Sequence, residues 1–539
     1  LPIQAFWFAL AGHGFLLFAT GRAALSVEPW PMLGVLLLLD VAVALAALAA
    51  SRAGLLVAAL AASQVVLAVW LSAAIGAPWP LVALASTIGV AALGLGALAF
   101  TPRFALGDEE AERFAVAAAV GLFGAQAVAL LATVLPGAPA FHWLLAGTLA
   151  LLVAEFRLAA RRAWENLVLL AVVPAVGAAA ALGASPGGFQ SAAAPTPWWQ
   201  VVLFAALVWT VFLASGLRVD LASRRANRTL LAVVLAGAGL FVVARAAMLH
   251  AGLSSVIGLL PVAQALLLLP LLRRLARRTT LAALRDDRQG DATYRLALVA
   301  GAMLAFVTVA IPMQLEKQWI TLGWALLGVA LAWLHRRVPH PGLVVWSFAL
   351  EIAAFVRLAV NPAVLTYHPR AATPVLNWYL YAYVVAALAM FAAAWWLREA
   401  RLEGSPFQAT PSLATGGTIL LFLLLNIEIA DYFSSGETLT FGFLGGRAGL
   451  PEDLAYTIGW ALFAIALLVA GLAGRRKSVR ICAIALLAVT VVKAFLHDTW
   501  RLGGLYRVGS LVGLAVSLAL VAVVLQKFVF RAGLEERER

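Results

Sequence analysis

Long apolar runs separated by short polar stretches dominate this 539-residue sequence. Many of the runs last about 20 residues, the length that an α-helix needs to cross the hydrocarbon core of a bilayer. They are rich in Ala and Leu, which favour helices, and they lack the alternation of polar and apolar positions that a membrane β-barrel requires. Because a backbone in lipid must pair its own N–H and C=O groups, the pattern predicts an all-α fold, a polytopic transmembrane helix bundle.

The pattern places about 18 spans along the chain, each of roughly 20 residues. The expected spans lie near 2–20, 31–50, 53–72, 78–99, 113–134, 138–157, 165–184, 198–217, 229–249, 253–272, 296–314, 318–334, 341–360, 375–397, 413–431, 454–474, 478–497 and 505–526. The links between them are short and often contain Pro or Gly, as is usual for turns. None of the links is long enough to hold a soluble domain.

Composition supports lipid as the main solvent. The chain is 64% hydrophobic and 12% charged, whereas a soluble domain is about half apolar and a quarter charged. The formal net charge of +13 resides in short loops and not on one basic domain, so we expect no nucleic-acid partner. The expected partners are membrane lipids, with other membrane or periplasmic subunits as a further possibility. With one cysteine, Cys482, the chain can form no internal disulfide.

The distribution of Lys and Arg predicts the orientation. Most of the 38 basic residues follow even-numbered spans or lie in the C-terminal tail, and basic loops remain on the cytoplasmic side. We therefore expect a multi-pass protein whose C-terminus is cytoplasmic. The chain begins at Leu1 inside an apolar run, which we interpret as a missing upstream segment.

A sequence repeat is visible in the second half. The hexapeptide that starts at Thr321 recurs at Thr457, and positions 321 and 457 are 136 residues apart. Each copy is followed by a basic pair and then by a cation late in the next span, Arg357 in one copy and Lys493 in the other. A fainter copy lies near Trp209. The alternative is convergent use of the same residue types in membrane helices.

The repeat unit comprises four spans, an even number, so its copies are expected to share one orientation, as in parallel repeats. The predicted organisation is about ten N-terminal transmembrane helices over 1–290, four-helix repeats over 291–410 and 411–530, and a cytoplasmic tail over 531–539.

Three segments carry a resemblance to a known family. They are FVTVAIPMQLEKQWITLGWALLGVAL at 306–331, LLLNIEIADYF at 423–433 and VVKAFLHDTWRLGGLYRVGSLVGL at 491–514. Over about 290–530 the chain resembles a bacterial polytopic membrane-protein family known as domain of unknown function 2339. The resemblance implies a location in the bacterial cytoplasmic (inner) membrane and supplies no activity.

Ionisable residues within spans form the candidate site, because each costs roughly 2.5–3.5 kcal/mol to insert and so requires a reason. Arg357 and Lys493 are expected late in outward-running spans, and Glu428 and Asp431 share a helix face because they are three residues apart. The predicted periplasm-facing binding site comprises Arg357, Glu428, Asp431, Lys493, Tyr506, Arg507 and, deeper in its span, Glu351. Snorkelling of the cations to the headgroups and simple ion pairing of the carboxylates are the alternatives.

Other polar residues in spans have simpler interpretations. We expect His13 and Asp40 to be satisfied polar groups of the core, and Glu155 to pair with Arg157 or its neighbours. The pair His497–Asp498 fits general-base chemistry or a helix-terminal hydrogen-bond cluster.

The sequence has no phosphate-cradling glycine motif and no H-E-x-x-H or Cys/His cluster, so we expect no ATPase, no metal and no cofactor. Three classes of function remain. The first is a carrier or flippase for an anionic or lipid-linked envelope solute. The second is a non-catalytic scaffold subunit of a membrane complex. The third is a periplasm-facing integral membrane transferase, although an enzyme is the less favoured reading and no catalytic residue is assigned.

Overall fold

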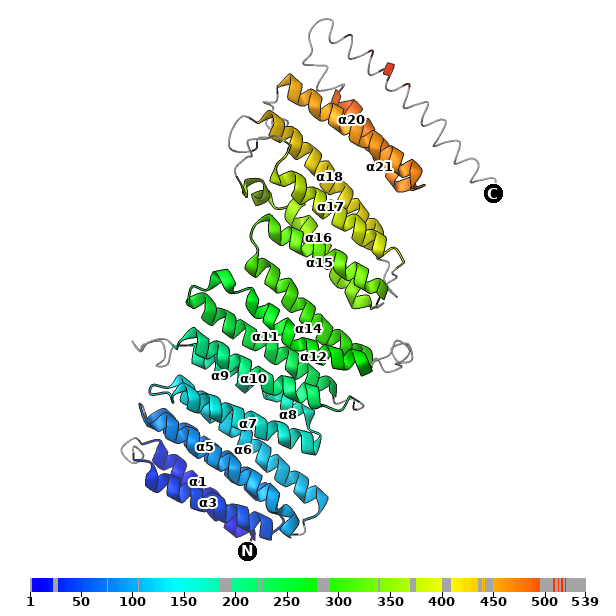
Figure 1. Ribbon diagram of the computed structural model, residues 1–539. Coiled ribbons are helices and arrows are strands. Elements are labelled where there is room, and N and C mark those ends of the chain that lie inside the picture. The colour runs from blue at the N-terminus through cyan, green and yellow to red at the C-terminus, as the bar shows by residue number, and fades with distance from the viewer. Residues whose placement is uncertain are drawn as a thin grey trace. The chain divides into compact units, whose positions relative to one another are not determined.

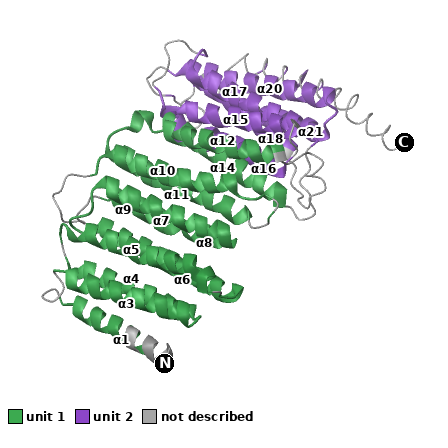
Figure 2. Cartoon of the chain, turned by 60° about the horizontal axis from the view of Figure 1, so that its bottom comes forward, with its two compact units in different colours: residues 1–314 green, residues 315–539 purple. Residues whose placement is uncertain are grey.

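The protein is described here from a computed structural model. The structure describes residues 2–22, 28–74, 76–104, 106–184, 196–221, 223, 226–278, 291–337, 340–368, 375–399, 409–434, 439, 441 and 449–494, with positions 508, 512, 515, 516 and 519. The described residues form helices joined by short links, and no strand occurs among them. The chain divides into two compact units, Leu1–Gln314 and Leu315–Arg539 (Figure 2).

Unit 1 is a stack of helices arranged broadly in chain order (Figure 1), in which helices further apart in the chain also pack together, as α1 does with α4 and α4 with α6. Its helices are α1 (Pro2–Thr20), α3 (Trp30–Ala49), α4 (Ala53–Ala73), α5 (Trp79–Phe100), α6 (Asp108–Val134), α7 (Phe141–Arg162), α8 (Glu165–Leu170), α9 (Val172–Gly183), α10 (Trp198–Arg218), α11 (Ala226–His250), α12 (Leu259–Arg278) and α14 (Asp291–Gln314). Two short 3₁₀ turns accompany them, η1 (Thr101–Phe104) and η3 (Ser254–Val256). Neighbouring helices pack directly, as in the pairs α5–α6, α10–α11 and α12–α14.

Unit 2 is built from three helical hairpins. Its elements are α15 (Gln318–Arg337), α16 (Pro341–Ala359), η4 (Pro362–Thr366), α17 (Trp378–Trp396), α18 (Ala409–Phe433), α20 (Leu450–Ala473) and α21 (Lys477–Lys493). Helix α15 pairs with α16, α17 with α18, and α20 with α21. The hairpins are joined through contacts of α17 with α15, and of α18 with α16 and α20.

The predicted fold class is confirmed. Among the described residues, 15 helices are long and apolar enough to cross a membrane. The first seventeen predicted spans each coincide with helical structure, whereas the span near 505–526 lies outside the described residues. The seventh span is interrupted at Ala171, between α8 and α9. Pro174 explains the break, because its ring has no N–H and clashes with the carbonyl four residues earlier.

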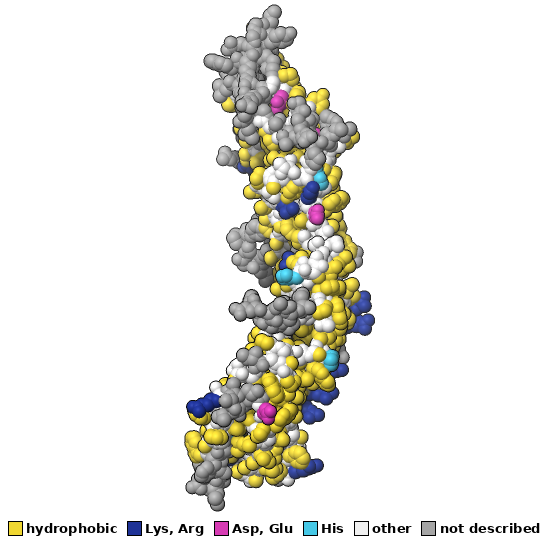
Figure 3. Space-filling model, turned by 90° about the vertical axis from the view of Figure 1, so that its left-hand side faces the viewer, with side chains coloured by type: hydrophobic (Ala, Val, Ile, Leu, Met, Phe, Trp, Pro, Cys, Tyr) yellow, Lys and Arg dark blue, Asp and Glu magenta, His cyan; other side chains and the backbone are white. Residues whose placement is uncertain are grey.

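The distribution of side chains is that of a protein surrounded by lipid. Small residues fill the contacts between helices, and Ala115, Ala118 and Ala125 of α6 are fully buried, which lets neighbouring backbones approach closely. Large apolar side chains point outward instead, with Leu38 72% and Val173 75% exposed. Hydrophobic side chains cover most of the face in Figure 3, and charged ones are few. Such a surface would be unstable in water.

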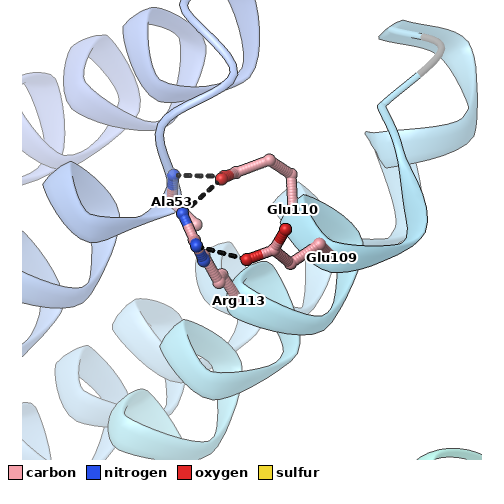
Figure 4. Close-up of polar contacts among 4 residues, drawn as sticks. All are labelled: Ala53, Glu109, Glu110 and Arg113. Carbon is pink, nitrogen blue, oxygen red and sulfur yellow. Dashed lines mark hydrogen bonds and ion pairs between the residues drawn. The ribbon is translucent and has the colours of Figure 1, made fainter.

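A polar contact joins two helix starts in unit 1 (Figure 4). The carboxylate of Glu110, in the first turn of α6, accepts a hydrogen bond of 3.4 Å from the backbone N–H of Ala53, the first residue of α4. Arg113 holds the acidic turn together through bonds of 2.6 Å to Glu110 and 2.5 Å to Glu109. An acceptor at this place satisfies an N–H that the helix itself leaves unpaired.

Candidate functional site

Most of the predicted site residues lie at one end of the helices of unit 2. At this end α16, α18 and α21 finish, and α15, α17 and α20 begin. Arg357, Glu428, Asp431 and Lys493 all lie there, within the last turns of their helices. Glu351 lies deeper in α16. Tyr506 and Arg507, like His497 and Asp498, lie outside the described residues.

The acidic pair of α18, Glu428 and Asp431, is bound by the side-chain amide of Asn377. Asn377 donates from Nδ2 to Oε2 of Glu428 and to Oδ2 of Asp431, both at 3.0 Å. The same side chain is the N-cap of α17, where its Oδ1 accepts from the backbone N–H of Leu380 at 3.0 Å. Asp431 is fully buried, and Oε1 of Glu428 is buried without a hydrogen-bond partner among the described residues. Asn377 therefore joins the start of α17 to the end of α18.

Arg357 approaches the acidic pair only through aromatic side chains. Its guanidinium lies 5.6 Å from the ring centre of Tyr367, which stacks on Trp378 at 5.9 Å, next to Asn377 in the chain. The Nη2 atom of Arg357 donates to the backbone carbonyl of Lys317 at 3.2 Å. No ion pair joins Arg357 to Glu428 or Asp431 in the described part of the chain. The carboxylates thus bind an amide and not this cation.

Lys493 is held in its own hairpin in the same way. Its Nζ donates to the backbone carbonyl of Asp453 at 3.1 Å and to Oγ1 of Thr457 at 2.7 Å. The acceptors Lys317 and Asp453 are 136 positions apart, as are the donors Arg357 and Lys493. In both hairpins, therefore, a cation at the end of the second helix bonds the carbonyl at the start of the first. The four-helix repeat itself stays a prediction.

Glu351 is buried between the helices of the first hairpin of unit 2. It is 0% exposed, and neither carboxyl oxygen has a hydrogen-bond partner among the described residues. The carboxyl packs against Gly328 of α15, where an added methyl group would lie 2.7 Å from Oε1. One turn earlier in α16, Ser347 donates to the carbonyl of Gly328 at 2.8 Å.

Buried polar residues of unit 1 also have partners. His13 and Asp40, predicted to be satisfied core groups, lie 3.3 Å apart, and Ser63 donates to the carboxyl of Asp40 at 2.8 Å. The three residues differ from a nucleophilic relay, because Nε2 of His13 contacts both Asp40 and Ser63, whereas a relay uses the two ring nitrogens separately.

The prediction that Glu155 pairs with Arg157 or its neighbours is wrong. Glu155 is fully buried, and its Oε2 accepts from Gln126 of α6 at 2.5 Å. Arg157 is exposed two residues further along α7, on another side of the helix, because residues two apart do not share a face.

A pocket of about 870 Å³ in unit 1 was not foreseen from the sequence. It lies between α7, α8, α10 and α11, and its lining includes Phe156, Val168, Val211 and Ala214 on the apolar side and Arg157, Glu165, Arg218 and Asp220 on the polar side. The two arginines come from helices 61 residues apart in sequence, at 157 and 218. Taken singly, each looks like an ordinary basic residue at the end of a span, so no sequence signal joins them.

No group of three or more His, Cys, Asp or Glu side chains that could hold a metal ion occurs within the described ranges. Apolar helices of membrane-spanning length, with a few polar groups buried between them and apolar side chains outside, define a polytopic helical membrane protein. Residues 342–528 match the family described as "Predicted membrane protein (DUF2339)". The match confirms the resemblance to domain of unknown function 2339 over this part of the chain.

No curated protein matches the chain. One solved structure, titled "Circular tandem repeat protein with novel repeat topology and enhanced subunit contact surfaces", is similar over 90% of this chain and 96% of its own, at 10% sequence identity and a TM-score of 0.27. A likeness at this score carries no conclusion about fold or function.

Proposed function

We propose that the protein is a carrier or flippase of the bacterial inner membrane for an anionic, lipid-linked envelope solute, with a cytoplasmic C-terminus. The observation that carries the proposal is the pocket between α7, α8, α10 and α11. Its volume of about 870 Å³ falls in the range of small-molecule sites, which span about 300–1,000 Å³. An apolar wall with a charged end fits a ligand that has a hydrocarbon part and a charged headgroup.

The polar side of the pocket has two arginines and two carboxylates, and the arginines are the groups that would bind an anionic headgroup. Arg157 and Arg218 have no hydrogen-bond or ion-pair partner among the described residues, so their guanidinium groups are available to a phosphate. Glu165 lies in the first turn of α8, where the helix dipole stabilises a carboxylate. Asp220 already has an interaction partner. Both arginines lie near the ends of helices that the distribution of basic residues assigns to the cytoplasmic side.

A scaffold subunit is the second candidate, and a specific observation favours it. Arg357 and Lys493 are both engaged by carbonyls of their own hairpins. Hydrogen bonds within their own hairpins hold both cations in place without a bound solute. The two candidates differ in whether a lipid-like solute moves across the bilayer.

Movement of a lipid probe tests the proposal. The purified protein is reconstituted into vesicles that contain fluorescent phosphatidylglycerol, and a membrane-impermeant reductant then bleaches the outer leaflet. We expect bleaching to exceed the outer-leaflet fraction, because probe from the inner leaflet reaches the outside. Arg157→Gln with Arg218→Gln should slow this movement at least about tenfold, the effect of losing about 1.4 kcal/mol of binding.

Arg161→Gln is the matched control. Arg161 is an exposed arginine at the same end of α7 but does not line the pocket, so its replacement should leave the rate unchanged. Bleaching that stops at the outer leaflet, as in empty vesicles, would contradict the carrier proposal and favour the scaffold. Equal slowing by Arg161→Gln would show that the pocket is not the site.

A further inference from the structure

Glu351 occupies a place where an ionised carboxylate has nothing to stabilise it. Its side chain is fully buried in the middle of α16, and both carboxyl oxygens lack a hydrogen-bond partner in the described part of the chain. An isolated carboxylate removed from water is so costly that such groups take up a proton instead. The backbone is arranged to receive this side chain, because Gly328 leaves the space that Oε1 fills.

The hairpin α20–α21, in which Lys493 bonds the carbonyl of Asp453 as Arg357 bonds that of Lys317, packs without a carboxyl at the position that corresponds to Glu351. With the displacement of 136 residues, Glu351 corresponds to Leu487 of α21, and Gly328 corresponds to Ala464 of α20. The serine that bonds Gly328 corresponds to Ala483. The hairpin α20–α21 therefore packs with three apolar residues at the corresponding positions. A polar set present in one hairpin and absent from the other points to a role other than packing.

The charged and titratable groups on the helices around Glu351 form their contacts with other groups and not with its carboxyl. On α15, Arg336 lies over the rings of Trp395 and Trp396 at 5.7 and 5.2 Å, and His335 contacts the carbonyl of His340. On α17, Tyr383 donates to the carbonyl of Leu358 at 2.8 Å, and Tyr379 donates to that of Leu365. On α18, Glu428 and Asp431 bond Asn377, and on α16 itself Arg357 bonds Lys317.

We infer that Glu351 is a proton-binding site within the membrane, and that its carboxyl carries the proton in the conformation described here. The proton is taken from water and returned to water when the contact of α16 with α15 opens, so the group cycles between carboxylic acid and carboxylate. Glu351 would do this whether the chain moves a solute or holds partner subunits. In a carrier, such a site is the means of coupling transport to the proton gradient.

Carbodiimide labelling of the full-length protein in membranes tests the inference. Dicyclohexylcarbodiimide enters lipid and adds to a protonated carboxyl: the acid proton goes to a carbodiimide nitrogen, the carboxyl oxygen bonds the central carbon, and the adduct rearranges to a stable acylurea without loss of atoms. We expect mass spectrometry to find the adduct at Glu351. The rate should fall at least about tenfold once the site is deprotonated at alkaline pH, a change that corresponds to one pH unit above the midpoint.

Three comparisons decide the outcome. Glu351→Gln removes the adduct and, because it exchanges one neutral polar group for another, should change the melting temperature by less than about 2 °C. Glu351→Leu introduces the residue found at position 487 and should also fold. Leu487→Glu should create an additional labelled position in α21. Absence of an adduct at Glu351 in a sample that is labelled at Glu155 would overturn the inference. So would a large loss of stability in Glu351→Gln, which would indicate an ionised, paired carboxylate.

Discussion

Asn377 connects two helices through one side chain, so its replacement gives the sharpest test of the polar cluster in unit 2. Asn377→Ala removes the N-cap of α17, which contributes about 1 kcal/mol, and two hydrogen bonds to the acidic pair, each worth about 0.5–1.5 kcal/mol. The expected loss in the free energy of unfolding is therefore about 2–4 kcal/mol. For a unit of this size, the melting temperature should fall by roughly 5–15 °C.

The assay is thermal unfolding of the detergent-solubilised protein, followed by intrinsic tryptophan fluorescence. Asn377→Ser separates the contribution of the N-cap from that of the bonds to the carboxylates. Serine caps a helix as well as asparagine does, but it has no side-chain amide that could donate to both carboxylates. Its melting temperature should fall between those of the wild type and of Asn377→Ala. Asn377→Asp keeps the cap and places a third carboxylate beside Glu428 and Asp431, so we expect it to be less stable than Asn377→Ser.

A double-mutant cycle decides whether the hydrogen bonds to Glu428 and Asp431 account for the stability lost when Asn377 is replaced. In a Glu428→Ala and Asp431→Ala background, Asn377→Ser should cost almost nothing, because the partners are gone. If Asn377→Ser costs as much in this background as in the wild type, or if Asn377→Asp is as stable as the wild type, the amide does not join α17 to α18 and the reasoning is wrong.

The remaining predictions concern pH, packing and orientation. Burial lowers the pKa of His340, the N-cap of α16. The unfolded chain therefore binds a proton more readily than the folded chain does. The stability that His340 contributes is present above its unfolded pKa of about 6.5 and is lost as the pH falls through the folded pKa. Melting curves should show this dependence flattened in His340→Asn, which caps at any pH; an unchanged pH profile would contradict it. Gly328→Ala should lower the melting temperature by overpacking Glu351, at about 1–3 kcal/mol, and Glu351→Ala in the same chain should restore most of the loss; no rescue would show that the strain lies elsewhere. In a Cys482→Ala background, Asp286→Cys should be labelled by a thiol reagent only after cells are opened, because this link is expected in the cytoplasm; labelling of intact cells would reverse the predicted orientation.

The helices could be predicted from the sequence because an apolar run of about 20 residues is a local signal that lipid makes nearly obligatory. The interruption at Ala171, which Pro174 explains, was not predicted, because the apolar run over 165–184 is continuous. Side-chain partners depend on which helix faces meet, and successive side chains of a helix point in directions that differ by about 100°. The pairing of Glu155 was wrong for this reason, since Gln126 comes from another helix.

For the acidic pair, too, the sequence predicted the spacing within one helix but not the partner from another helix. The spacing of Glu428 and Asp431 predicted a shared face, and both reach the same nitrogen of Asn377. Asn377 itself was missed, because it fell at the start of the span predicted over 375–397, where a polar residue has the appearance of an ordinary helix cap. The unit 1 pocket was missed because Arg157 and Arg218 are brought together only by packing.

The bonds of Arg357 and Lys493 to the carbonyls of Lys317 and Asp453 have a consequence for how the chain enters the membrane. Each cation stands at the trailing end of the second helix of its hairpin, and its acceptor stands at the leading end of the first. During synthesis the acceptor carbonyl is made first, and its donor is added about 40 residues later, as positions 317 and 357 show. A charged side chain that must cross the bilayer loses its hydration on the way. The bond forms only when both helices are present and antiparallel, so we expect the pair of helices, and not the single helix, to be the unit released into lipid during insertion.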